Sequence, residues 1–148
     1  MTDTTDSSSD FMQKYNGRLV ALRQWSDLAA FWETLLKDAD DGWYVYGVGE
    51  PPPTEPVSAA KLGEFVRELD ALLHRDHDED YCGIVYVDDR EHPEFVKVYD
   101  PNNLGSSCGS SGLVILPGWT LSRARPVDLQ MAFPLPGNRR RWWQKLFG

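Results

Sequence analysis

The chain has 148 residues, of which 23 are Asp or Glu and 15 are Lys or Arg, so its formal net charge is −8. This length suits one domain with its own hydrophobic core, and the negative charge argues against nucleic-acid binding, which needs a basic face to displace counterions. The N-terminal residues lack the basic start and apolar run of a secretory signal, and no stretch reaches the roughly 18 apolar residues of a membrane span. We therefore expect a cytoplasmic protein.

Residues 1–10 are polar and acidic, and we expect a disordered tail there because they offer little apolar surface to bury. The apolar residues 19–22 suit an edge strand. Ser26 is predicted to cap a helix in which apolar residues recur at helical spacing up to Leu36. Residues 43–48 are aromatic and β-branched, which predicts a strand that is apolar on both faces and central in its sheet.

The second half of the chain begins with a helix that Ser58 is predicted to cap and that extends to about Arg75. Its apolar residues form one continuous stripe, so this helix should pack on the core. Four further segments have the composition of strands: residues 82–87, 95–99, 113–116 and 119–121. The segment 119–121 either extends the strand 113–116 or forms a strand of its own.

This order of elements, with helices early and consecutive strands late, predicts an α+β fold. We expect an antiparallel or mixed sheet of about four to five strands, with two helices packed mainly on one face. The single domain should span residues 11–137, followed by a separate basic aromatic tail over residues 138–148. Lys97 indicates that one face of its strand is wetter than the other.

The C-terminal tail is the most unusual segment, because it has four basic residues and no acidic one. Arg and Trp are residue types that carry binding energy at interfaces. A segment this short cannot hold a helix alone in water, so it should order against a partner protein, an anionic membrane surface or the acidic body of its own chain. The candidate partner-binding residues are Arg139, Arg140, Arg141, Trp142, Trp143, Lys145 and Phe147.

A Gly/Ser-rich stretch contains Cys108, which suggests a nucleophile if a histidine deprotonates it. His92 is the nearest candidate base, and Asp100 would orient it. The stretch fits no phosphate-binding Gly-Lys-Ser/Thr pattern, although its backbone amides could hold an anion. A flexible connecting loop with no catalytic or binding role explains the same composition.

A second cluster contains His74, His77 and Cys82, which are residue types that bind zinc. The spacing matches no known pair of ligand knuckles, and a solvated acidic loop explains the cluster equally well. We therefore expect neither a metal nor a cofactor. The aromatic residues of the strands either pack the core or line a small-molecule pocket on the sheet: Trp43, Tyr44, Tyr46, Tyr86, Tyr99 and Trp119.

Together these features favour a non-enzymatic accessory or adaptor protein that binds an unidentified protein partner through its acidic surface and its Arg/Trp tail. One alternative is a thiol-dependent enzyme or sensor that uses Cys108. The other is peripheral association with an anionic membrane through the tail.

Overall fold

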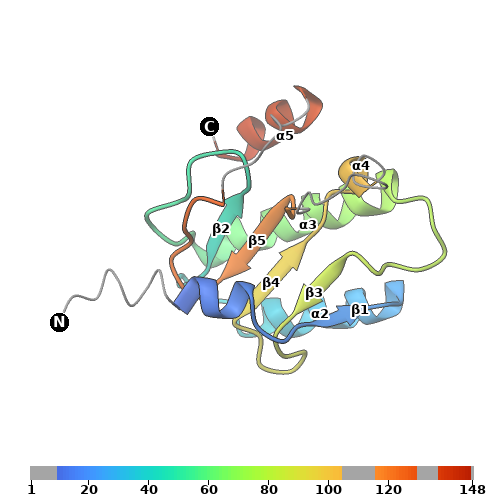
Figure 1. The fold of residues 1–148 in the computed structure, drawn as a ribbon, viewed down its shortest axis with the longest axis horizontal. Helices are drawn as coiled ribbons and strands as arrows, with labels where there is room; N and C mark the ends of the chain where they lie inside the picture. The colour runs from blue at the N-terminus through green and yellow to red at the C-terminus, as the bar shows by residue number, and fades with distance from the viewer. Residues whose placement is uncertain (1–9, 105–115, 130–136, 148) are drawn as a thin grey trace.

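The computed structural model describes residues 10–104, 116–129 and 137–147, and the described strands form one five-stranded antiparallel sheet. The strand order across the sheet is β1-β3-β4-β5-β2 (Figure 1). The predicted α+β class is confirmed. The strands are β1 (Val20–Leu22), β2 (Tyr44–Gly47), β3 (Val85–Val87), β4 (Phe95–Val98) and β5 (Trp119–Ser122).

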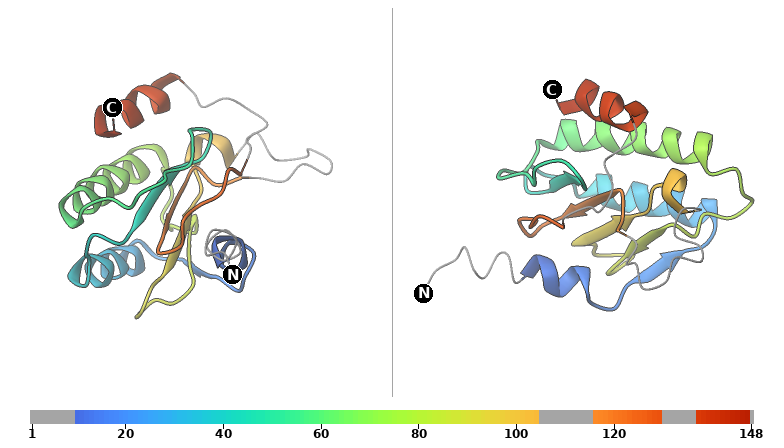
Figure 2. Two further views of the ribbon diagram at one scale, coloured as in Figure 1. Left: turned by 90° about the vertical axis from the view of Figure 1, so that its left-hand side faces the viewer. Right: turned by 45° about the horizontal axis from the view of Figure 1, so that its top comes forward.

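Two long helices, α2 (Trp25–Lys37) and α3 (Ala59–Asp76), cover one face of the sheet, as predicted (Figure 2). A short helix of residues 10–15 lies on the opposite face. The helix α4 (Pro101–Leu104) follows β4, and α5 (Gly137–Phe147) runs beside α3. Among the described residues, no helix combines the length and the apolar character needed to cross a membrane.

The helix starts follow local hydrogen bonding. Ser58 caps α3 as predicted, because its hydroxyl accepts the backbone N–H of Lys61 at 3.1 Å. The predicted cap at Ser26 is wrong, since α2 begins at Trp25 and its cap position is Gln24. The backbone N–H of Gln24 donates to the carboxylate of Asp27 at 3.1 Å, which is the bond that the third helical residue makes in a capping box.

The strand over residues 43–48 is an edge strand, which corrects its predicted central place. Its apolar residues are buried on both faces because α3 and α5 lie on one side and the helix 10–15 on the other. The predicted strand over residues 113–116 lies outside the described residues except for Leu116, which precedes β5. Residues 119–121 belong to a strand of their own, paired with β2 and β4.

The main core lies between the sheet and the two long helices. The predicted apolar stripe of α3 is buried there, and full burial of such a side chain stabilises a fold by about 1.5–3 kcal/mol. A smaller cluster forms on the other face, where Phe11 of the N-terminal helix packs edge-on against Phe95 with ring centroids 5.7 Å apart. The stripe consists of Leu62, Phe65, Val66, Leu69, Leu72 and Leu73.

Candidate functional site

The C-terminal tail forms the helix α5, and a buried arginine anchors it to the domain. Arg139 is 2% exposed, and its Nε and Nη2 atoms donate to the two carboxylate oxygens of Asp100 at 3.1 and 3.2 Å. Nη2 also donates to Asp76 at 2.6 Å. We call Arg139, Asp76 and Asp100 the arginine clamp. It joins α5 to the C-terminal end of α3 and to the segment between β4 and α4.

The clamp favours the charged form of Arg139 although this side chain is buried. Burial opposes the charge of Arg139, but hydrogen bonds to Asp100 and Asp76 outweigh it and raise the pKa of the guanidinium. Hydrogen bonds from Arg75 and then Arg139 hold the pKa of Asp76 below its ordinary value of 3.8. These contacts favour the charged forms of Arg139 and Asp76, which is what a buried ion pair requires.

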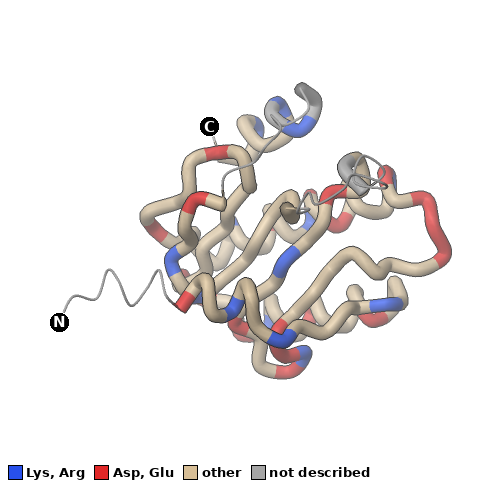
Figure 3. The backbone as a smooth tube through the Cα atoms, viewed as in Figure 1, with Lys and Arg blue, Asp and Glu red and all other residues tan. Residues whose placement is uncertain are grey.

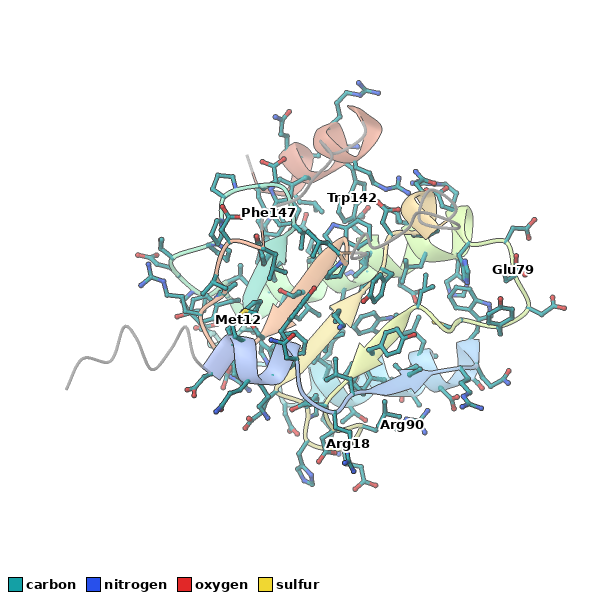
Figure 4. All side chains as sticks on the ribbon, viewed as in Figure 1. Met12, Arg18, Glu79, Arg90, Trp142 and Phe147 are labelled. Atoms are coloured by element: carbon teal, nitrogen blue, oxygen red, sulfur yellow. The ribbon has the colours of Figure 1, made fainter. Side chains whose placement is uncertain are left out.

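Aromatic packing adds to the clamp. The rings of Trp142, Trp143 and Phe147 surround Phe65 of α3, with centroid distances of 5.9, 6.3 and 6.0 Å. Trp142 also packs edge-on against Trp119 of β5 at 5.7 Å. Both labelled residues of α5, Trp142 and Phe147, lie on the side of the helix that faces the domain (Figure 4). The tail packs against the acidic body of its own chain, one of the three surfaces considered.

A glycine on β2 makes room for this helix. A Cβ atom built on Gly47 would lie 2.9 Å from Cζ3 of Trp143, which is closer than non-bonded carbon atoms pack in proteins. The sequence contains a signal for this contact, because glycine inside a strand often marks a close approach of another group. No local pattern indicated that Asp76 and Asp100 would pair with Arg139.

The opposite side of the helix is exposed. Arg141, Gln144 and Lys145 make up this surface, which we call the outer face of α5. Within the described residues, neither Arg141 nor Lys145 forms an ion pair. The seven predicted partner-binding residues thus differ in exposure. Arg139 is buried, the rings of Trp142, Trp143 and Phe147 are half-buried, and Arg141 and Lys145 face solvent. The side chain of Arg140 is not among those that the structure describes.

Of the predicted thiol site, the described residues His92 and Asp100 are not brought together. Cys108 lies outside the described residues. His92 is exposed in the connection between β3 and β4, where its backbone N–H donates to Asp89 at 3.1 Å. Asp100 lies beyond the other end of β4 and is occupied by Arg139, so it cannot orient His92.

The residues of the predicted metal site have other partners. His74 stacks on Trp25 at 4.1 Å, and its Nε2 lies 3.6 Å from the carboxylate of Asp70. Nε2 of His77 lies 2.8 Å from the carbonyl oxygen of Cys82, and burial raises the pKa of the Cys82 thiol. In the part of the chain that the structure describes, no group of three or more His, Cys, Asp or Glu residues is placed to hold a metal ion.

No family model, curated protein or solved structure matches this chain. Any function must therefore be supported by the side chains themselves. On the outer face of α5, Arg141 and Lys145 have no ion pair among the described residues and adjoin incompletely buried aromatic rings. Arginine and aromatic residues are enriched at interfaces.

Proposed function

We propose that the protein is a non-enzymatic cytoplasmic adaptor, and that the outer face of α5 binds an acidic surface of a partner protein. The observation that supports this most is the exposure of Arg141 and Lys145, one helical turn apart and unpaired among the described residues, on a chain of net charge −8. Acidic positions are spread over the rest of the domain, whereas α5 carries basic ones (Figure 3). An acidic partner would be repelled elsewhere and attracted at α5, which fixes its orientation.

The anchoring of α5 supports the same proposal. The arginine clamp and the packing around Phe65 hold the helix in place before any partner arrives. Binding then does not require the partner to order a free tail, which removes part of the entropic cost of association. The exposed edges of Trp142 and Phe147 beside the cations would supply apolar contact.

The two alternatives receive less support. Membrane association requires the aromatic rings to enter the headgroup layer, whereas here they pack around Phe65. The exposed cations Arg141 and Lys145 would add only about 1 kcal/mol each at an anionic surface. Use of Cys108 as a thiol catalyst stays a prediction, testable by its alkylation rate near neutral pH.

The test is a charge reversal that leaves the inner side of α5 intact. Removal of the whole tail is unsuitable, because it would strip Phe65 of its cover and leave Asp100 buried without its cation. We suggest capture experiments from native lysate with the double variant Arg141→Glu and Lys145→Glu. The matched control reverses two exposed cations of the α2 region, Arg23→Glu and Lys37→Glu, with the same change in net charge.

We expect wild type and control to retain a protein that the α5 variant loses, and this loss to grow weaker as salt screens the attraction. Thermal unfolding of all three proteins should show similar midpoints, because exposed substitutions change stability little. Equal retention by the three proteins would contradict the proposal. Retention of anionic vesicles in place of a protein would favour the membrane alternative.

A further inference from the structure

The sheet face opposite α2 and α3 carries a polar row that neither the core nor α5 uses. Tyr86, Lys97 and Thr120 lie directly opposite one another on β3, β4 and β5. Their strand neighbours Val96, Val98 and Leu121 point into the main core, so by alternation the row faces the other way. The helix 10–15 covers the adjoining part of this face through Phe11 and Phe95.

Lys97 is half-buried and has no counter-charge among the described residues. Its Nζ lies 4.6 Å from the ring centroid of Tyr15 and 5.7 Å from that of Tyr99. Burial lowers the pKa of Lys97, and within the described part of the chain no carboxylate pairs with it. In a protein with 23 carboxylates, a partly desolvated cation whose described neighbours are tyrosine rings is unusual.

Thr120 is next to Lys97 across the strands and is 0% exposed. Its hydroxyl has no hydrogen-bond partner in the part of the chain that the structure describes, which is costly for a buried polar group. Ser122, two residues further along β5, shows the usual solution, since its hydroxyl donates to the carbonyl of Ala124 at 2.7 Å. An unused cation and an unused hydroxyl therefore lie side by side on one face.

We propose that Lys97 and Thr120 form a binding site for a small oxyanion, a carboxylate or a phosphate, flanked by the rings of Tyr15, Tyr86 and Tyr99. The ammonium group provides charge and hydrogen-bond donors, and the Thr120 hydroxyl donates one further bond. The surrounding rings favour a ligand whose anionic group is attached to a flat apolar body. This site is separate from the outer face of α5 and does not depend on the adaptor proposal.

A purely structural role for Lys97 explains less. Cation–π contact with Tyr15 would help to hold the helix 10–15 on the sheet. Such contact supplies the ammonium group with no anionic partner and gives the Thr120 hydroxyl no hydrogen bond. An oxyanion between the two side chains would satisfy both groups at once.

The test is a titration of the full chain with benzoate, phenyl phosphate and inorganic phosphate, followed by NMR of the Thr120 methyl and the Lys97 side chain. We expect saturable shifts with a Kd of about 1 mM or below for at least one of the aromatic anions. Comparison of benzoate with phenyl phosphate identifies the preferred anion, and inorganic phosphate shows whether the ring contributes.

Three variants and one control make the result specific. Lys97→Met should weaken binding about tenfold or more, Lys97→Arg should retain it, and Thr120→Val should weaken it severalfold. Lys37→Met removes an exposed lysine elsewhere and should change nothing. Absence of saturable shifts in wild type, or equal binding by Lys97→Met with its core methyl signals intact, would overturn the proposal.

Discussion

Two hydroxyl groups on β5 have the same burial but opposite hydrogen-bonding states, which predicts opposite effects of removing them. Thr120→Val replaces an unpartnered hydroxyl with a methyl of similar size, so we expect the free energy of unfolding to rise by about 1 kcal/mol. Ser122→Ala removes a bonded hydroxyl and should lower it by about 1 kcal/mol. Urea unfolding measures both. A destabilised Thr120→Val protein would mean that the hydroxyl has a partner.

At this scale the sequence predicted part of the sheet's polar face. The single charged residue among the apolar residues of β4 predicted a wetter side; Lys97 itself is half-buried, while Phe95 on the same face is fully buried. The sequence did not indicate that Lys97 lacks an anionic partner. That property depends on which strands and which helix meet around it, and Tyr15 and Thr120 are far from Lys97 along the chain.

At the scale of elements, the arginine clamp should dominate the attachment of α5. Arg139→Met leaves the buried carboxylate of Asp100 without its cation, so we expect a loss of about 3–5 kcal/mol in the free energy of unfolding. Adding Asp100→Asn to this variant should recover part of the loss, because the stranded charge is then absent. Denaturant unfolding of the single and double variants tests this.

The control for this prediction is Arg141→Met on the opposite side of the same helix. Its exposed guanidinium has no ion pair within the described residues, so stability should change by less than about 0.5 kcal/mol. Similar losses for Arg139→Met and Arg141→Met would mean that the clamp is not what holds α5.

The elements differ in how far the sequence determined them. The helix α3 was predictable because its cap and apolar stripe are local patterns, and both are confirmed. The attachment of α5 was not, since Arg139 and Arg141 are the same residue type in the same short segment. Only the tertiary structure makes one internal and the other external, through carboxylates that lie far away along the chain.

At the scale of the whole molecule, acid should weaken the fold partly through Asp76. The pKa of Asp76 is depressed in the folded state, so its contribution to stability is complete above its ordinary value of 3.8 and is lost as the pH falls through the lower folded value. We expect Asp76→Asn to be less stable than wild type at neutral pH. Its stability should fall less steeply below about pH 4.

Urea unfolding of the two proteins at neutral pH and at two acidic pH values measures this slope. The exposed carboxylates Asp40 and Asp89 also have lowered pKa values, but salt should screen their contribution. Parallel pH profiles for wild type and Asp76→Asn at high salt would contradict the role given to Asp76.

The layers of the molecule were predictable, whereas the order of the strands was not. Early helices and late strands indicated an α+β arrangement, which is confirmed. The apolar character of residues 43–48 indicated a central strand, yet β2 is at an edge. A strand that is buried on both faces is apolar throughout, whether it lies at the centre of a sheet or at an edge covered by helices. The sequence therefore could not distinguish a central strand from a covered edge strand.

The contact between Gly47 and Trp143 has a consequence for how such chains can diverge. Positions 47 and 143 lie far apart in the sequence, yet the indole of Trp143 occupies the place where a side chain at position 47 would begin. A larger residue at position 47 would be tolerated only with a smaller one at position 143. In relatives of this chain, we expect the two positions to covary in size, so that the mode of attachment of the C-terminal helix could be inferred from an alignment.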